Sequence, residues 1–174
     1  LIAAGYVYIG MDHFALPKDE LVIAQENGTL HRNFQGYSTR GYCDLIGLGV
    51  SSIGKVGDNY MQNLKTLPEY YGALDRGELA VHRGLSLTRD DVIRRDVIQQ
   101  IMCYGVLDYD KTSERFGIDF RSYFASELLT LEPMVADGLA EFTEPGLRVL
   151  PAGRLLLRHL GMAFDAYLAS AQAA

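Results

Sequence analysis

The sequence has little cysteine, and its histidines are not spaced to hold a metal. Only two cysteines, Cys43 and Cys103, occur among 174 residues. Because no signal-peptide pattern is visible, we expect buried, unpaired thiols in a reducing compartment, which predicts a cytoplasmic protein. The four histidines lack the close spacing that places two imidazoles on one ion, so we expect no metal site in this chain.

Long apolar runs and an excess of positive charge are also absent. A helix that spans a bilayer needs about 20 mostly apolar residues, and no run in the chain approaches that length. The formal net charge is -6, whereas binding to nucleic acid needs a basic face. We therefore expect neither a membrane nor a nucleic acid as the main partner. Arginines in the second half leave a winged-helix nucleic-acid-binding module as an alternative.

The composition that is present suits a globular protein with a core. Hydrophobic residues make up 48% of the chain and charged residues 22%. Residues 6–10 are aromatic and β-branched, and residues 44–50 are apolar and rich in glycine, so we predict buried strands in both segments. Residues 17–26 are predicted to form a helix that ends at Asn27–Gly28. Helices that alternate with strands are typical of an α/β barrel or a doubly wound sheet.

The second half of the sequence is predicted to be mostly helical. Residues 78–84 are typical of a linker, and we place a domain boundary there. Thr88–Asp91 forms a capping box ahead of an apolar periodic run. Residues 120–136 carry an apolar stripe with helical spacing, and residues 138–150 are predicted to form a hairpin. With a last helix at 151–168, this order is close to that of a winged helix.

An aromatic side chain next to a carboxamide is the clearest local signal of a binding site. We expect residues 31–43 to form an irregular loop, because glycine, serine, asparagine and aromatics dominate it. Within it, Phe34 could stack on a flat ligand while Gln35 hydrogen-bonds to it. Packing within the loop is an equally good interpretation.

Asp12 and His13 are secondary candidates for a site. They directly follow the strand predicted at residues 6–10, and ligands of α/β folds bind at that edge of the sheet. The alternative is a histidine that is hydrogen-bonded to the backbone of its own loop.

Several segments, in one order, resemble the C-terminal portion of oxygen-independent coproporphyrinogen III oxidases. That family consists of radical S-adenosylmethionine (SAM) enzymes of heme biosynthesis. The segments are GYVYIGMDHFA (5–15), LHRNFQGY (30–37), GLGVSSIG (47–54), LTRDD (87–91) and IRRDVI (93–98). The resemblance extends from Gly5 to about Leu168.

The resemblance implies a fold, a reaction and two cofactors. It implies the last strands of a partial (β/α) radical-SAM barrel in residues 1–80 and a mostly helical, winged-helix-like C-terminal domain in residues 81–174. The implied reaction converts two propionates of coproporphyrinogen III to the vinyl groups of protoporphyrinogen IX, with a [4Fe-4S] cluster and SAM. The cluster motif C-x-x-x-C-x-x-C is absent here. We therefore expect these 174 residues alone to bind no cluster and to be inactive.

The same resemblance implies roles for individual residues. Phe34, Gln35 and Ile53 match family residues that line the region of the substrate and a second SAM. Heme chaperones of the same superfamily carry His-Asn-x-x-Tyr-Trp where this chain has RNFQGY (32–37), and the chain has no Trp. The sequence therefore favours the oxidase, with the heme chaperone as an alternative.

The first residues suggest that the chain is a C-terminal part of a longer protein. Residues 1–4 are predicted to finish a helix that Gly5 ends. Without the remaining strands of a barrel, the predicted strands at 5–10 and 44–50 would have open edges. We therefore expect the isolated chain to form a dimer.

Overall fold

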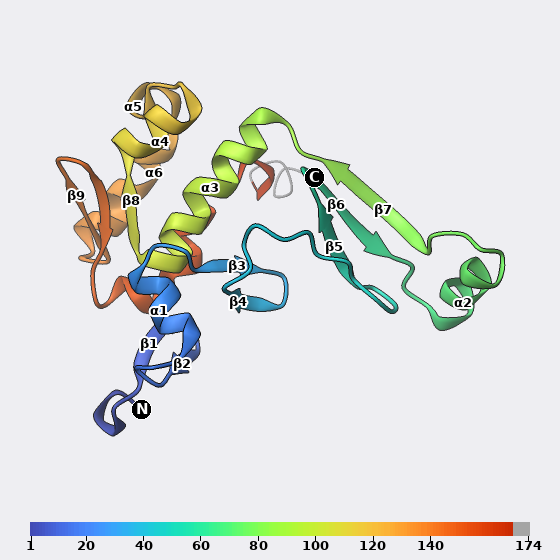
Figure 1. The fold of residues 1–174 in the computed structure, drawn as a ribbon. Coiled ribbons are helices and arrows are strands. Elements are labelled where there is room, and N and C mark those ends of the chain that lie inside the picture. The colour runs from blue at the N-terminus through green and yellow to red at the C-terminus, as the bar shows by residue number, and fades with distance from the viewer. Residues whose placement is uncertain (169–174) are drawn as a thin grey trace. The chain divides into compact units, whose positions relative to one another are not determined.

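The computed structural model describes residues 1–168 and divides the chain into two compact units (Figure 1). The first unit comprises Leu1–Gly41 together with the chain from Ile93 onward, and the second comprises Tyr42–Val92. Both contain helices and strands, as the sequence predicted. No helix among residues 1–168 is long and apolar enough to cross a membrane.

The N-terminal part of the first unit consists of short elements. In chain order they are η1 (Ile2–Ala4), β1 (Val7–Gly10), β2 (His13–Ala15), α1 (Glu20–Glu26), β3 (His31–Asn33) and β4 (Gly36–Ser38). Gly5 ends η1 in the left-handed conformation, with φ 86°, as predicted. The predicted helix α1 is also present, and its N-cap Asp19 accepts a hydrogen bond from the backbone N–H of Leu21.

The segment predicted as an irregular loop is instead a hairpin. β3 pairs antiparallel with β4, with Arg32 opposite Tyr37 and Asn33 opposite Gly36. Gly36 has φ 132°, a conformation that favours glycine, and the side chain of Asn33 accepts a hydrogen bond from the N–H of Gln35 (2.8 Å). Each strand has only three residues, which is too short for alternation to reveal it.

The rest of the first unit combines helices with a three-stranded antiparallel sheet of order β8-β10-β9. Its elements are α3 (Arg89–Tyr104, which begins in the second unit), β8 (Val106–Asp108), α4 (Tyr109–Phe116), α5 (Phe120–Tyr123), α6 (Ala125–Ala136), β9 (Ala140–Thr143), β10 (Gly146–Val149), η2 (Gly153–Leu156) and α7 (Leu157–Met162). The predicted hairpin is confirmed as β9 and β10, and β8 is an addition that the sequence did not reveal. Gly146 permits this pairing, because a Cβ there would lie 1.8 Å from the carbonyl oxygen of Leu107.

The core of the first unit lies around α3. The stripe predicted for residues 120–136 is present, but the helix is interrupted at Phe124, between α5 and α6. Phe124 is fully buried, and its ring lies 5.4 Å from that of Phe164. Burial of each such aromatic side chain contributes roughly 1.5–3 kcal/mol. A smaller cluster that includes Ile9 and Cys103 packs the N-terminal elements against the same helix.

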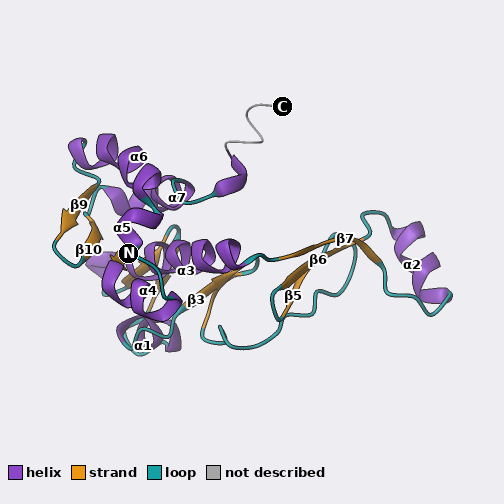
Figure 2. Cartoon of the chain, turned by 90° about the horizontal axis from the view of Figure 1, so that it is seen from above, coloured by secondary structure: helices purple, strands orange, loops and turns teal. Residues whose placement is uncertain are grey.

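The second unit is a three-stranded antiparallel sheet with one helix, as Figure 2 shows. Its elements are β5 (Ile53–Val56), β6 (Asn59–Asn63), α2 (Leu67–Asp75) and β7 (Val81–Ser86), with strand order β5-β6-β7. β7 corrects the prediction of a linker at residues 78–84, because this strand pairs with β6 along its length.

The prediction of a buried strand at residues 44–50 is wrong. Only Leu45 makes a bridge, to Lys55, and the side chain of Leu48 is 82% exposed. The amide of Asn63 donates hydrogen bonds to the carbonyls of Gly47 and Gly49, at 3.0 and 2.9 Å. These bonds hold the segment as a loop and occupy carbonyls that a neighbouring strand would need.

Candidate functional site

The candidate residues Phe34 and Gln35 form the tip of the β3–β4 hairpin. The side chain of Phe34 is 57% exposed, and Gln35 is exposed as well. Both side chains are therefore accessible on a turn whose backbone is fixed by Asn33 and Gly36. An exposed ring beside an amide can stack on a flat ligand and hydrogen-bond to it.

Helix α3 holds both strands of this hairpin. The backbone N–H of Arg32 donates to Gln99 Oε1 (3.0 Å), and Gln99 Nε2 donates to the carbonyl of Arg32. On the other strand, the hydroxyl of Tyr37 donates to the carbonyl of Met102 (2.9 Å). Burial raises the pKa of Tyr37 above its ordinary value, which keeps the hydroxyl protonated as a donor.

His13 lies against the same hairpin. It belongs to β2 rather than to a loop, and its ring lies edge-on to that of Tyr37, with 5.1 Å between the ring centroids. Its Nδ1 is 2.8 Å from Asp12 Oδ1 but outside hydrogen-bond geometry. A Cβ on Gly36 would lie 3.4 Å from its Nε2. The structure thus brings His13 to the base of the turn that carries Phe34 and Gln35.

Ile53 belongs to the second unit, whereas Phe34 and Gln35 belong to the first. It is the first residue of β5, is partly buried, and pairs with Gln62 of β6. Its place in a strand gives the side chain a fixed direction from the sheet.

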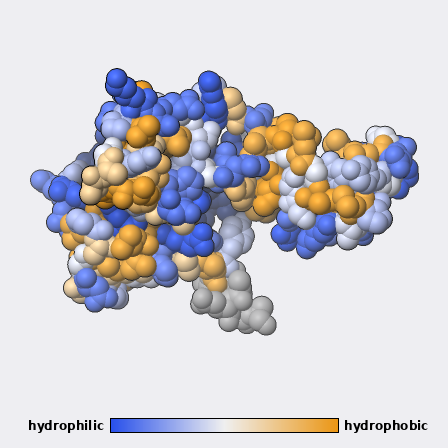
Figure 3. Space-filling model, turned by 90° about the horizontal axis from the view of Figure 1, so that it is seen from below, coloured by the Kyte–Doolittle hydropathy of each residue, from blue (hydrophilic) through white to orange (hydrophobic). Residues whose placement is uncertain are grey.

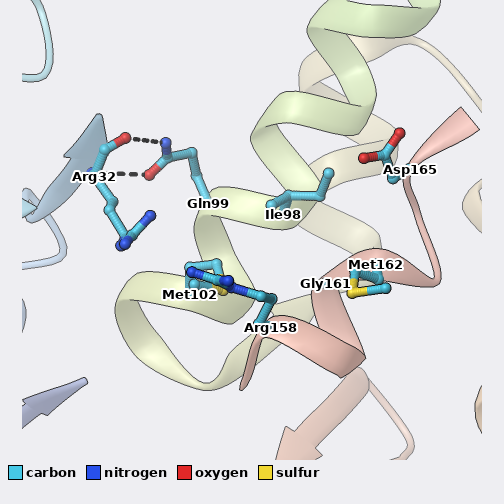
Figure 4. Close-up of a pocket in the computed structure, with 8 residues that line it drawn as sticks. All are labelled: Arg32, Ile98, Gln99, Met102, Arg158, Gly161, Met162 and Asp165. Atoms are coloured by element: carbon cyan, nitrogen blue, oxygen red, sulfur yellow. Dashed lines mark hydrogen bonds between the residues drawn. The ribbon is translucent and has the colours of Figure 1, made fainter. Parts of the chain in front are cut away.

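A cavity of about 220 Å³ in the first unit was not predicted from the sequence. Figure 4 shows its lining, which combines two arginines and an aspartate with apolar side chains. The lining residues are Arg32, Ile98, Gln99, Met102, Arg158, Gly161, Met162 and Asp165. They come from β3, α3, α7 and the segment after α7, so no local motif could have revealed them.

The guanidinium of Arg32 is partly satisfied within the protein. It lies 5.6 Å from the centroid of the Tyr37 ring, in cation–π contact. Its Nε is buried and has no hydrogen-bond partner among the described residues. A buried donor without a partner destabilises the protein, so an acceptor that reached Nε would be bound favourably.

Residues 1–168 offer no set of ligands that fits an iron–sulfur cluster. Within residues 1–168, no three His, Cys, Asp or Glu side chains are grouped so that they could hold a metal ion. Cys103 is buried, and burial raises the pKa of its thiol to about 12. Cys43 is exposed, which corrects the expectation that both thiols are buried. Cluster binding needs several thiolates, and these two residues do not supply them.

Comparison with known proteins supports one family. Residues 87–156 match the family model described as the HemN C-terminal domain. The chain is 55% identical over 170 residues to the oxygen-independent coproporphyrinogen III oxidase of Pseudomonas aeruginosa, covering 98% of this chain and 37% of that protein. With the protein of the same name from Escherichia coli (strain K12), it is 51% identical over 168 residues, which are 97% of this chain and 37% of that protein.

The fold agrees with the sequence. A solved structure described as "Coproporphyrinogen III oxidase (HemN) from Escherichia coli is a Radical SAM enzyme" matches with a TM-score of 0.91 and 50% identity. The match covers 96% of this chain and 38% of that one, so the chain spans well under half the length of these relatives. The resemblance inferred from the sequence segments is thereby confirmed. Residues 87–156 match the HemN C-terminal domain model, and nearly the whole chain is similar in sequence and fold to one part of the oxygen-independent coproporphyrinogen III oxidases.

Proposed function

We propose that the chain is the C-terminal part of an oxygen-independent coproporphyrinogen III oxidase and is inactive without the rest of that enzyme. The supporting observation is the similarity over nearly the whole chain to proteins of which it spans only about 37%. The longer enzyme would be a cytoplasmic radical-SAM oxidoreductase that oxidatively decarboxylates two propionate side chains of coproporphyrinogen III to vinyl groups, with release of CO₂, giving protoporphyrinogen IX.

The rest of the enzyme would supply the cofactors. A [4Fe-4S] cluster and SAM, held by residues outside this chain, would supply the radical chemistry. The residues of this chain would instead shape the space beside that chemistry. Phe34 would stack on the substrate or a second SAM, Gln35 would hydrogen-bond to it, and Ile53 would help to exclude water. His13 would support the turn through its contact with Tyr37.

The domain division belongs to the same proposal. We assign residues 81–174 to the C-terminal helical domain, which the family match beginning at residue 87 supports. Helices packed with the β8-β10-β9 sheet are compatible with a winged-helix-like arrangement. Residues 1–80 would belong to the catalytic domain. Because β1 pairs with β2, and β5 with β6, in antiparallel fashion, we propose that these strands flank the barrel rather than continue its parallel sheet.

A chimera tests this function. The part of the P. aeruginosa enzyme that matches this chain would be replaced by the chain, and protoporphyrin formation from coproporphyrinogen III would be followed by fluorescence. We expect activity from the chimera and none from the 174 residues alone. Gln35→Ala in the chimera should lower turnover while iron content and thermal midpoint stay unchanged. A folded, cluster-loaded chimera without activity would contradict the proposal.

A further inference from the structure

The cavity between β3, α3 and α7 is not used by the function proposed above. We propose that it binds a carboxylate carried on a short apolar stem, with the guanidinium groups of Arg32 and Arg158 on the carboxylate and the stem against Met102. The inference rests on the residues that line the cavity. Only the choice of a tetrapyrrole as one probe rests on the proposed function.

Contacts with Gln99 and Tyr37 fix Arg32 at the wall of this cavity. Its backbone is fixed on both sides by Gln99, which also lines the cavity. Its guanidinium is held against the face of Tyr37, while its Nε stays buried without a hydrogen-bond partner among residues 1–168. A guanidinium group that is already held in place loses little entropy when it binds an anion.

Arg158 supplies the second positive charge. It comes from α7 and is exposed. In Figure 4 its guanidinium and that of Arg32 lie toward one end of the lining, whereas the carboxylate of Asp165 lies toward the other. Guanidinium groups bind the two oxygens of a carboxylate through paired N–H donors. Asp165 disfavours a second negative charge, so the lining suits a single carboxylate better than a phosphate dianion.

The remaining wall suits hydrocarbon. Ile98, Met102 and Met162 contribute apolar surface to the cavity. Gly161 lies beside them, and a Cβ there would make ordinary contacts with Ile98 and Met102, at 3.6 and 3.7 Å. Methionine side chains adapt to ligands of different shape. A cavity of about 220 Å³ is smaller than the roughly 300–1,000 Å³ that encloses a whole small-molecule ligand, so it suits one arm of a ligand.

The test uses the 174-residue chain labelled with ¹⁵N and followed by NMR. The carboxylate probes are hexanoate and coproporphyrin III, and their neutral counterparts are hexanamide and the coproporphyrin tetramethyl ester. Inorganic phosphate is the third kind of probe. We expect both carboxylates to shift the side-chain amide of Gln99 and the backbone amide of Gly161 in a saturable way. The neutral probes and phosphate should bind at least tenfold more weakly.

Three variants identify the site. Arg32→Gln and Arg158→Gln should each weaken carboxylate binding at least tenfold. Arg148→Gln is the matched control, because it removes the same charge from β10, where Arg148 pairs with Glu141 at 3.3 Å and does not line the cavity. It should leave binding unchanged. If Arg32→Gln fails to fold, Arg158→Gln carries the test, since the exposed side chain of Arg158 is not needed for the core.

The outcomes separate this inference from the proposed function. The carboxylate pocket would be refuted if the neutral probes or phosphate bound as tightly as the carboxylates. It would also be refuted if Arg148→Gln weakened carboxylate binding as much as Arg32→Gln and Arg158→Gln do. A response to neither carboxylate would also overturn it and would leave the chimera result untouched. A response to hexanoate that depends on Arg32, without any response to coproporphyrin III, would support the pocket and exclude the tetrapyrrole as its ligand.

Discussion

Gly10 is the last residue of β1, and a methyl group at this position would collide with Tyr37 of the β3–β4 hairpin. A Cβ at this position would be 2.1 Å from the hydroxyl oxygen of Tyr37 and 3.3 Å from the carbonyl oxygen of Met102. Gly10→Ala should therefore break the hydrogen bond between those two groups and lower the free energy of unfolding by about 1–3 kcal/mol. Urea unfolding measures the loss.

Two further variants distinguish a local clash from a general effect of removing glycine. Tyr37→Phe in the Gly10→Ala background removes the nearest atom and should recover part of the lost stability. Gly72→Ala, in helix α2, meets only the end of the flexible Arg76 side chain at 3.5 Å. It should be neutral or stabilising, because alanine favours a helix. Equal destabilisation by both alanines would refute the steric explanation.

The ion pair between Arg94 and Glu127 should make stability depend on pH. Arg94 Nη1 lies 2.8 Å from Glu127 Oε1, and their side chains are only 17% and 13% exposed. Burial opposes ionisation of Glu127, but hydrogen bonds from Ser126 and Arg94 outweigh it and lower the pKa of this carboxyl. Because the folded pKa is the lower one, the contribution of Glu127 is complete above the unfolded value of about 4.3 and is lost as pH falls through the folded pKa.

Glu127→Gln isolates this contribution. At pH 7 it should lower the free energy of unfolding by about 1–3 kcal/mol, because the partly buried Arg94 loses its charged partner. The loss should shrink as the pH is lowered toward 3, where the wild-type carboxyl is protonated as well. Urea unfolding at several pH values measures the difference. Glu141→Gln, at the more exposed pair with Arg148, should change stability little at any pH. A loss in Glu127→Gln that is constant with pH would exclude the ionic mechanism.

Among the elements, the β3–β4 hairpin is the one whose position depends most clearly on a single side chain. Gln99 satisfies both backbone groups of Arg32. Gln99→Leu should leave these groups without partners, speed hydrogen exchange at the amide of Arg32, and cost about 1–3 kcal/mol. Gln99→Glu keeps the acceptor but loses the donor, so its effect should be intermediate. Unchanged exchange in Gln99→Leu would mean that the hairpin is held by other contacts.

Elements that are specified by neighbouring residues, such as a cap or a turn, could be predicted from the sequence. Segments whose structure is fixed by contacts with distant residues could not. The capping box is real: the N–H of Thr88 donates to Asp91 Oδ2 (2.8 Å), and the N–H of Asp91 donates to Thr88 Oγ1 (3.2 Å). The hairpin of β9 and β10 had an equally local turn. Residues 44–50 were misassigned, because the side chain that fixes them, Asn63, lies in another strand.

The same difference between neighbouring and distant residues applies to the candidate site and the cavity. Phe34 and Gln35 could be proposed as site residues from the sequence because they are adjacent in it. The cavity was missed, because Arg32, Gln99 and Arg158 are each unremarkable in their own segments and meet only through the packing of β3, α3 and α7. Sequence periodicity describes which face of an element is apolar, and it contains no information about such a meeting of distant segments.

At the scale of the whole molecule, the second unit is unusual because it buries little of its own apolar surface. Its buried hydrophobic residues are Ala73 and Ala80, whereas the first unit buries a set of phenylalanines, leucines and isoleucines around α3. Figure 3 shows hydrophobic side chains on the surface of the second unit. Among the apolar side chains of this unit, Ile46, Leu48 and Leu79 are 65–87% exposed. Such a surface is typical of a protein that makes further contacts.

The expected dimer therefore has a different structural basis from the one that the sequence suggested. Residues 44–50 are not a strand, and β1 is paired with β2. β7 instead lies at the edge of the β5-β6-β7 sheet, and all six of its residues are exposed. An exposed edge strand with apolar residues such as Val81 and Leu85 pairs readily with another chain. We predict that the isolated chain dimerises through β7.

Light scattering over a range of concentrations tests the dimer, and charge at the edge tests its location. Lysine at an edge strand opposes pairing, so Val81→Lys with Leu85→Lys should shift the molecular mass toward that of the monomer, 19.3 kDa. Leu129→Lys is the matched control, since Leu129 is 64% exposed but belongs to helix α6 rather than to β7. It should leave the mass unchanged. A monodisperse monomer of the unaltered chain at every concentration would contradict the dimer, and a dimer that persists in the double variant would locate the contact elsewhere than β7.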